Sequence, residues 1–534
     1  MILVNAKEMR NMDNFTIEEM GVPGVVLMEN AGRGAARYLL EHFQPEQGQK
    51  VYVIAGKGNN GGDGYVVARY LHLYGLDVKV CVLAEYEKIS GDAKINLDII
   101  KNMGIEIGYV PEYESWKSIL SSIREADLIV DAIFGTGLQA EIRGFYRDII
   151  EDINSLKKPV LSIDIPSGVS SDNGKVMGVA IRAELTVTFG YPKVGHLIFP
   201  GARHCGRVVV IDIGLCPVPD ERLKLRYRLI EPEEFIEFLR GDEPDIHKGR
   251  RGHLLVIAGS TGKTGAATLT ALGALRAGAG LVTLCIPETL NHILEIKLTE
   301  AMTEPLPDTG RGFFSKDAIE RALELAEGKS AVAIGPGIST DPETVEFVRK
   351  FIRRCRLPMV IDADGLNCIS KDPDLLKDNS SRLIITPHPG EMSRIVGVAI
   401  SKIQDNRIKT CEEFIENYGT HLVLKGARTI VALPNKEIFI NPTANPVLSS
   451  GGTGDVLTGL IGGFLARGLP LDKAAIAGVY IHGICGERLS EEKGESGVLA
   501  GELLSIVPEV IQKLTLHEWP LSGIPFHEEL CPRL

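Results

Sequence analysis

The sequence predicts an α/β protein with two domains. The chain has 534 residues, more than one hydrophobic core usually organises. Along both halves, short apolar runs rich in β-branched residues alternate with glycine-rich turns and helical segments. This alternation is typical of a doubly wound parallel sheet, which binds ligands at the carboxyl ends of its strands.

Composition limits the classes of function. Hydrophobic residues make up 44% and charged residues 24% of the chain, as in a soluble globular protein, and the formal net charge of −12 argues against nucleic acid and anionic membranes as partners. The start lacks the pattern of a signal peptide, and no apolar run reaches membrane-spanning length. Nine scattered cysteines without a Cys-x-x-Cys pair predict neither a disulfide framework nor a zinc site. We therefore expect a cytoplasmic protein.

The first half begins with two predicted helices within residues 5–42, separated by a turn at 21–24. A buried strand at 51–55 then leads into a glycine loop at 56–64, a helix at 65–74 and a strand at 78–83. Gly56, Gly58 and Gly61 fit the dinucleotide-binding spacing, although one match is weak evidence. The neighbouring Asn59-Asn60 pair and Asp63 are more informative, because they add amides and oxygens to a phosphate-sized turn.

Two later strands carry matching chemistry at their ends. The strand at 128–131 ends on Asp131 and leads into a glycine turn, and the strand at 160–164 ends on Asp164 and leads into Ser167. These loops should meet at one sheet edge, gathering Asn60, Asp131 and Ser167 as oxygen ligands of an alkali or alkaline-earth cation. Asp164 is then a candidate base. Each residue taken singly is also a common turn or capping residue. Strands at 185–190 and 207–212 would complete a Rossmann-like sheet.

A proline-rich, charged stretch separates the halves. The strand pattern ends at residues 216–221, and few apolar contacts are expected up to residue 252. We place the first domain at residues 1–225, the second at 226–515, and a tail outside the core at 516–534. Second-domain strands are predicted at 254–258, 331–334, 359–362, 383–385 and 421–424, followed by a meander at 430–433 and 437–440.

The turn after the strand at 254–258 imitates a phosphate-binding P-loop. Gly262-Lys263-Thr264 supplies the end of that motif, but its required first glycine falls at Ile257. The P-loop interpretation therefore fails. Gly265 and Ala266 still allow a ligand to approach the start of a small-residue helix at 266–279.

The most informative stretch is Ser449-Ser450-Gly451-Gly452-Thr453-Gly454-Asp455, which opens an apolar helix. Its glycines and the positive helix end suit a phosphate, whereas a carboxylate beside an anion suits a proton acceptor. Phosphoryl transfer to a hydroxyl explains both, with Asp455 taking the hydroxyl proton. The alternative is an ordinary capped helix. His388, between two prolines, is a candidate ligand contact, and the turn at Lys425 suits either nucleotide phosphate or a simple hairpin.

These motifs, in this order, resemble the family of bifunctional NAD(P)H-hydrate repair enzymes over nearly the whole chain. The first half is similar to an NAD(P)H-hydrate epimerase domain through residues 56–64, 131–137 and 164–168. The second half is similar to an ADP-dependent NAD(P)H-hydrate dehydratase of the ribokinase-like superfamily. That similarity is carried by residues 247–249, 335–337, 362–367, 386–391 and 452–455.

The resemblance implies roles for individual residues. Asp164 would be the acid/base group of epimerisation, and Asn60, Asp131 and Ser167 would bind K⁺. The hydrate in the epimerase site would contact Asn59, Asn60, Gly61, Gly62, Asp63, Gly135, Thr136, Gly137, Leu138, Gln139, Ala140, Glu141 and Asp164. In the dehydratase site the S hydrate would contact Ala266, Gly337, His388 and Asp455. ADP would contact Lys425, Gly426, Ala427, Arg428, Thr429 and Gly454.

The implied reaction joins these parts. Asp455 would deprotonate the hydrate's hydroxyl, ADP would phosphorylate it, and phosphate would leave as NADH or NADPH re-forms, giving AMP and phosphate. Mg²⁺ is expected to bridge the nucleotide phosphates, and we expect a homo-oligomer. The main alternative is a ribokinase-like kinase of a vitamin-precursor alcohol, fused to a nucleotide-binding or assembly module.

Overall fold

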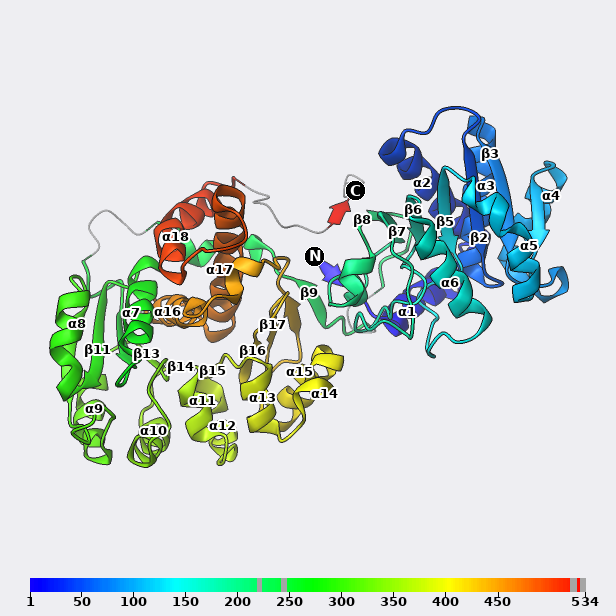
Figure 1. Ribbon diagram of the computed structural model, residues 1–534. Helices are drawn as coiled ribbons and strands as arrows, with labels where there is room; N and C mark the ends of the chain where they lie inside the picture. The colour runs from blue at the N-terminus through cyan, green and yellow to red at the C-terminus, as the bar shows by residue number, and fades with distance from the viewer. Residues whose placement is uncertain (219–222, 242–246, 519–525, 529–534) are drawn as a thin grey trace. The chain divides into compact units, whose positions relative to one another are not determined.

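A computed structural model describes residues 1–218, 223–241, 247–518 and 526–528 (Figure 1). Contacts divide the chain into two compact units. One contains Ile2–Tyr227 together with the short strand Phe526–Glu528, and the other is built from residue 228 onward. The division follows the change in sequence pattern after residue 216.

The first unit is built on one parallel sheet of eight strands, in the order β19-β8-β7-β6-β5-β2-β3-β4. The strands are β2 (Lys50–Ala55), β3 (Asp77–Val82), β4 (Glu106–Tyr109), β5 (Leu128–Ala132), β6 (Val160–Ile163), β7 (Leu185–Phe189), β8 (Arg207–Ile211) and β19 (Phe526–Glu528). The predicted doubly wound sheet is confirmed. We expected residues 516–534 to form a tail outside the core. Three of them, Phe526–Glu528, instead form β19, which pairs with β8.

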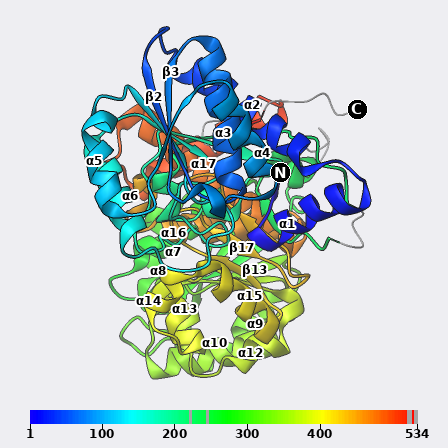
Figure 2. The same cartoon turned by 90° about the vertical axis from the view of Figure 1, so that its right-hand side faces the viewer.

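Helices cover both faces of this sheet (Figure 2). Along β2, alternate side chains point to opposite faces. Val51 and Val53 pack with α2 (Gly24–Phe43), α3 (Asn59–Tyr74) and α4 (Gly91–Asn102). Tyr52 and Ile54 pack with α5 (Tyr113–Arg124) and α6 (Phe145–Leu156). A further helix, α1 (Ala6–Asn14), is capped by Asn5.

The glycine loop after β2 is shorter than predicted, since α3 already begins at Asn59. Close packing explains the difference. A methyl group at Gly61 would lie 2.1 Å from the carbonyl oxygen of Gly56, and one at Gly64 would lie 2.6 Å from Cβ of Ala132. These glycines let the first turns of α3 lie against the ends of β2 and β5, so the Asn59-Asn60 pair and Asp63 belong to the helix start.

The second unit has a mixed sheet. Its central strands run β12-β11-β10-β13-β14-β15-β16 in parallel, and β17 and β18 follow as the predicted antiparallel meander. They are β10 (His253–Ile257), β11 (Leu281–Pro287), β12 (Met302–Leu306), β13 (Ala331–Ile334), β14 (Met359–Ile361), β15 (Leu383–Ile385), β16 (His421–Leu424), β17 (Ile430–Ala432) and β18 (Ile438–Ile440). The strands β11 and β12 were not predicted.

One face of this sheet packs against α7 (Thr264–Arg276), α16 (Thr453–Ala466), α17 (Leu471–Lys493) and α18 (Ala500–Thr515). The other carries a row that includes α10 (Pro342–Arg354), α11 (Asp364–Ile369), α13 (Pro389–Val396) and α15 (Arg407–Tyr418) (Figure 1). Helices α7 and α16 touch backbone to backbone. A methyl group at Gly459 would lie 2.3 Å from the carbonyl oxygen of Thr270, and one at Gly273 would lie 2.9 Å from that of Val456.

The stretch before β10 packs more closely than its charge predicted. Ile230, Phe235, Ile236 and Leu239 are buried in the core under α17 and α18, and the rings of Phe235 and Tyr480 lie 5.5 Å apart. The expectation of few apolar contacts up to residue 252 is therefore wrong for this part. Apolar residues recur among the charges at intervals that place them on one side of short 3₁₀ turns. Residues 242–246 of that stretch lie outside the described residues.

Candidate active sites

In the first unit, Asp164 follows directly on β6, at the carboxyl edge of the sheet. Its side chain is only 13% exposed. Lys193 Nζ lies 2.6 Å from Oδ1 of Asp164, and Thr188 donates a hydrogen bond of 3.0 Å to the same oxygen. Burial alone would raise the pKa of Asp164, but the Lys193 charge and these hydrogen bonds together lower it. The backbone φ of Asp164 is +65°, a left-handed conformation that costs a non-glycine residue free energy.

Asn60 and Gly135 lie beside this carboxylate. A methyl group on Gly135 would lie 3.0 Å from Oδ1 of Asn60 and 3.3 Å from Oδ2 of Asp164. The amide nitrogen of Asn60 is buried and has no hydrogen-bond partner among the described residues. A buried donor without a partner costs free energy, so this amide is available to a ligand. The structure thus brings together three of the predicted substrate contacts.

Asp131 and Ser167 form a closed network at the same edge. Ser167 donates to Asp131 from its hydroxyl (2.5 Å) and its amide (2.8 Å), and Ser162 adds a third bond (2.8 Å). The amide of Ile133 donates a fourth. Phe134 N in turn donates to the Ser167 hydroxyl. These carboxylate oxygens are therefore already occupied. Among the three predicted K⁺ ligands, the Asp131 carboxylate is therefore fully used by protein donors, and the unpartnered atom of Asn60 is its amide nitrogen, which cannot bind a cation. The trio as arranged therefore offers K⁺ no free carboxylate.

Sequence reasoning missed Lys193, His196 and Asp13 near Asp164. Lys193 follows the end of β7 by four residues, so a lysine soon after a strand end was a usable signal. His196 Nε2 lies 2.9 Å from the carbonyl oxygen of Asp164, and burial lowers its pKa to about 4. Asp13 lies on α1, where nothing in its spacing indicated the sheet edge. Burial raises the pKa of Asp13 to about 6. Burial also raises the pKa of Asp63, a predicted substrate contact.

The remaining predicted epimerase contacts differ in exposure. Asn59, Gly137, Gln139, Ala140 and Glu141 are exposed, and Glu141 forms an ion pair with Arg143. Thr136 and Leu138 are half-buried, whereas Gly61 and Gly62 are buried in the first turn of α3. The loop at 136–141 therefore lies open to solvent beside the buried carboxylate.

In the second unit, Asp455 lies in the first turn of α16. The helix begins after Gly452, whose φ of +96° requires a residue without a side chain. Burial and the charge of Asp362, against the opposing charge of Lys425, raise the pKa of Asp455 to about 7. A carboxylate that titrates near neutral pH is suited to accept a proton in a reaction.

Lys425 connects the carboxylates around this helix start. Its Nζ lies 2.6 Å from Oδ1 of Asp362 and 3.9 Å from Oε2 of Glu391. The hydroxyl of Thr458 on α16 donates to Oδ2 of Asp362 at 2.7 Å. A methyl group at Gly454 would lie 3.5 Å from Lys425 Nζ. The predicted nucleotide contacts Lys425 and Gly454 are therefore neighbours, and a cation lies beside the predicted base.

The predicted substrate contacts Ala266 and Gly337 also meet. A methyl group at Gly337 would lie 3.0 Å from Cβ of Ala266 and 2.9 Å from Cβ of Lys263. Lys263 forms an ion pair of 2.7 Å with Asp364. His388 caps α13 by accepting a bond from Gly390, leaving its side chain 51% exposed. Burial and the charges of Lys425 and Arg394 lower the pKa of His388, so its imidazole is neutral at pH 7.

A buried arginine holds the predicted nucleotide loop. Arg407 on α15 donates to the carbonyl oxygens of Ala427 (2.6 Å) and Leu424 (3.1 Å). Thr429 closes the loop by donating to the carbonyl oxygen of Gly426, while Arg428 has a φ of +55°. The loop is thus an ordered turn with a fixed backbone. Arg407 gave no sequence signal, since it lies in an amphipathic helix without a motif.

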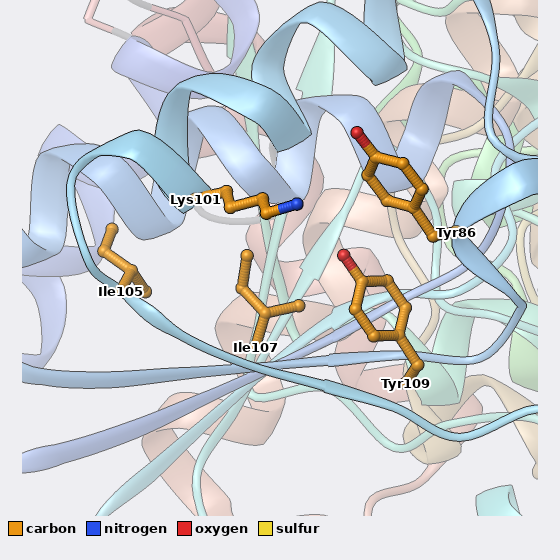
Figure 3. A pocket seen from close by; sticks show the side chains of 5 residues that line it. All are labelled: Tyr86, Lys101, Ile105, Ile107 and Tyr109. Atoms are coloured by element: carbon orange, nitrogen blue, oxygen red, sulfur yellow. The ribbon is translucent and has the colours of Figure 1, made fainter.

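One cavity lies apart from these residues. It has a volume of about 430 Å³ and is lined by Tyr86, Lys101, Ile105, Ile107 and Tyr109, from α4, β4 and the turn before α4. Lys101 extends toward Tyr86 across it (Figure 3). It contains none of the predicted site residues.

No described helix is long and apolar enough to cross a membrane, and no disulfide joins the eight cysteines of the described part.

Family profiles match each of the two units. The profile of a family described as NAD(P)H-hydrate dehydratase matches residues 254–509, and that of the YjeF-related protein N-terminus matches residues 24–195. A solved ADP/ATP-dependent NAD(P)H-hydrate dehydratase from Bacillus subtilis, co-crystallised with ATP and Mg²⁺, is 30% identical, with a TM-score of 0.45. The match covers 54% of this chain and 98% of the Bacillus subtilis chain.

Full-length relatives carry one shared name. The bifunctional NAD(P)H-hydrate repair enzyme of Moorella thermoacetica is 40% identical over 96% of this chain and 97% of its own length. The enzymes of the same name from Thermofilum pendens and Dictyoglomus turgidum are 35% and 36% identical, each over 96% of this chain and over 97% and 99% of their own lengths. The resemblance seen in the sequence is confirmed, and the alternative of a vitamin-precursor kinase is not supported. The chain belongs to the family of bifunctional NAD(P)H-hydrate repair enzymes.

Proposed function

We propose that this chain interconverts the R and S forms of hydrated NADH and NADPH and dehydrates the S form with ADP. Residues 1–225 would carry epimerisation and residues 226–515 dehydration. One observation supports the dehydratase most directly. A carboxylate with a pKa near 7, Asp455, lies at a helix N-terminus beside the Lys425–Asp362 pair. That arrangement provides a base and positive charge for an anion at the same place.

In dehydration, Asp455 takes the proton of the hydrate's hydroxyl. The hydroxyl oxygen then attacks the β-phosphorus of ADP, and the bond from that phosphorus to the bridging oxygen breaks, releasing AMP. Lys425 and the amides at the start of α16 stabilise the charge that develops on the transferred group. Phosphate subsequently leaves the carbon, and a proton leaves the adjacent carbon as the double bond re-forms. Phosphate is a far better leaving group than hydroxide, so phosphorylation of the hydroxyl drives the dehydration.

In epimerisation, the hydroxyl-bearing carbon is also bonded to the ring nitrogen, because water adds to an enamine at that carbon. Asp164 takes the hydroxyl proton, the carbon–nitrogen bond breaks to give an aldehyde, and the same proton passes to nitrogen. The nitrogen then attacks the other face of the aldehyde while Asp164 takes the proton back from nitrogen and passes it to the oxygen. A single carboxylate is therefore enough for every proton transfer of the epimerisation. The free amide of Asn60 is available to orient the substrate.

The metal assignments rest on the chemistry of the donors. Mg²⁺ in nucleotide sites is usually held by phosphates with one or two carboxylates, and Asp362 and Glu391 beside Lys425 could supply these. When bound, it would neutralise phosphate charge. A K⁺ ion bound by Asp131 would have to displace donors that now hold that carboxylate, so no step is assigned to it. Replacing K⁺ by choline in the assay tests this ion, since unchanged epimerisation would exclude it.

We further infer that the chain acts in the cytoplasm and forms homo-oligomers. Both inferences rest on the sequence alone, and size-exclusion chromatography with light scattering tests the second.

The decisive assay starts from mixed R and S hydrates of NADH with ADP and Mg²⁺. Complete recovery of NADH, with one AMP and one phosphate per molecule, is expected. Recovery of only the S fraction would remove the epimerase proposal. A stable phosphorylated product without NADH would instead indicate a kinase.

A further inference from the structure

We propose that Lys193 is a positioning residue of epimerisation, which holds Asp164 as an oriented carboxylate facing Asn60 and Gly135. This inference rests on the proposed epimerase function. It assigns to Lys193 a role toward Asp164 and no contact with substrate.

The geometry of Lys193 is unusual for a lysine. Its side chain is 1% exposed, whereas lysines are almost never fully buried without a partner. Nζ lies 2.6 Å from Oδ1 of Asp164 and donates to Thr188 Oγ1 (2.7 Å) and to the carbonyl oxygen of Phe189 (3.0 Å). These three partners use all three ammonium protons. Lys193 is thus a fixed charge, bonded to one oxygen of the carboxylate.

The second oxygen of Asp164 faces the predicted substrate position. Oδ1 is occupied by Lys193 and Thr188, whereas Oδ2 lies 3.3 Å from the position of a methyl group on Gly135. The two oxygens therefore have separate tasks. Binding at Oδ1 fixes the carboxylate plane, and Oδ2 is left to exchange a proton.

The backbone around Lys193 is fixed as well. Its amide donates to Nδ1 of His196, whose Nε2 lies 2.9 Å from the carbonyl oxygen of Asp164. Since Nδ1 accepts, Nε2 carries the proton and donates to that carbonyl. Lys193 and Asp164 are thus joined through their side chains and through His196, which supports the left-handed backbone at Asp164.

Charge explains why a lysine is needed here. Asp13 on α1 and Asp63 on α3 also face Asp164, and both interact electrostatically with Lys193. Three neighbouring carboxylates, of which Asp164 is buried and Asp13 and Asp63 are half-buried, cannot all ionise easily without a compensating cation. His196 is neutral at pH 7 because its pKa is about 4. Among these groups Lys193 alone supplies positive charge, and it contacts Asp164 directly.

The test compares two variants of the full chain, Lys193→Met and Thr188→Val, across pH 5 to 9. Lys193→Met removes the charge, so the pKa of Asp164 should rise and epimerisation at pH 6 should fall at least about 100-fold. At pH 9 the carboxylate ionises again, and the loss should shrink to about tenfold or less. Thr188→Val removes only a neutral bond from the same oxygen, a smaller contribution than the Lys193 charge, and should therefore move the acidic limb of the profile in the same direction but clearly less. Dehydration of the S hydrate by each variant reports that the second unit is folded.

An equal loss at all pH values, or full activity at pH 6, would overturn the proposal. So would the same shift in Thr188→Val, because it would indicate general packing damage. If wild-type protein itself does not accelerate epimerisation, the proposed function fails instead. Should Lys193→Met not fold, carboxyl ¹³C NMR of the wild-type chain decides the matter. The Asp164 carboxyl resonance is identified as the one missing from the spectrum of Asp164→Asn. Its pKa in the wild-type chain should lie below that of an ordinary aspartate, and a pKa above it would refute the role of Lys193.

Discussion

At the scale of residues, the two proposed active sites contain carboxylates whose pKa values are shifted in opposite directions. Asp164 has its pKa lowered by a buried lysine, whereas burial raises that of Asp455 to about 7. Both are proton acceptors in the proposed reactions, yet they should respond differently to pH near neutrality.

Dehydration should therefore depend on pH through Asp455. Below pH 7 the free enzyme loses its ionised base, so kcat/KM should fall about tenfold per pH unit and level off above pH 7. Above pH 7, where the base is ionised, Asp455→Asn should lower kcat by about 10²–10⁴-fold while nucleotide binding persists. Initial rates with purified S hydrate and calorimetric titration with ADP measure the two effects. A flat profile from pH 5 to 8 would contradict the assignment of Asp455 as base.

The same pKa shift has a consequence for stability. The pKa of Asp455 is about 7 in the folded protein and close to 3.8 when unfolded, so the folded state holds the proton more tightly. The free energy of unfolding therefore decreases as pH rises from about 4 to 7. Asp455→Asn cannot ionise and escapes this decrease. Its Tm advantage over wild type should grow between pH 5 and pH 8 in differential scanning calorimetry. If the Tm advantage of Asp455→Asn were larger at pH 5 than at pH 8, folding would not raise the pKa of Asp455.

At the scale of elements, the contact between α7 and α16 fixes the helix that carries Asp455, the proposed dehydratase base. Asp455 lies in the first turn of α16, and Gly459 one turn later meets the backbone of α7. Gly459→Ala would place Cβ 2.3 Å from the carbonyl oxygen of Thr270. We expect the second unit to lose about 1–3 kcal/mol of stability and dehydration to fall, with epimerisation unaffected.

Gly501→Ala is the matched control. Gly501 lies in α18, where an added methyl group meets nothing within 4 Å. Replacing an exposed helical glycine by alanine should be neutral or stabilise by about 0.4–1 kcal/mol. Chemical denaturation of both variants, monitored with dehydratase activity, tests the pair. Equal effects would mean that the contact between α7 and α16 has no special role.

Sequence reasoning predicted elements best where a motif followed a buried parallel strand. Residues 331–334, 383–385 and 421–424 are strands at those bounds, because continuous apolar runs between turn residues are distinctive. It failed at β12, where Met302–Leu306 contains Thr, Glu and Pro and has no apolar pattern. At the sites, motifs indicated candidates such as Asp455, whose role stays a prediction. Lys193 offered only its place soon after a strand end. Arg407 and Asp13 gave no signal, because their roles depend on which segments the fold brings together.

At the scale of the whole molecule, each activity belongs to one unit, so the two should be separable. Asp164→Ala should convert only the S hydrate, and Asp455→Asn should convert none while still equilibrating R and S. Because the S hydrate is a diffusible product of one site and the substrate of the other, an equimolar mixture of the variants should recover all the NADH. Chromatography of the remaining hydrates follows the reaction. A mixture that stops at the S fraction would indicate that the intermediate passes only within one chain.

The left-handed backbone at residue 164 also bears on evolution. Glycine or asparagine adopts that conformation more easily than aspartate, so folding alone favours replacement at this position. An aspartate persists there only while selection for its carboxylate outweighs the strain. In a descendant chain that had lost epimerisation, this position should be among the first to drift, and a glycine there would mark a retired active site.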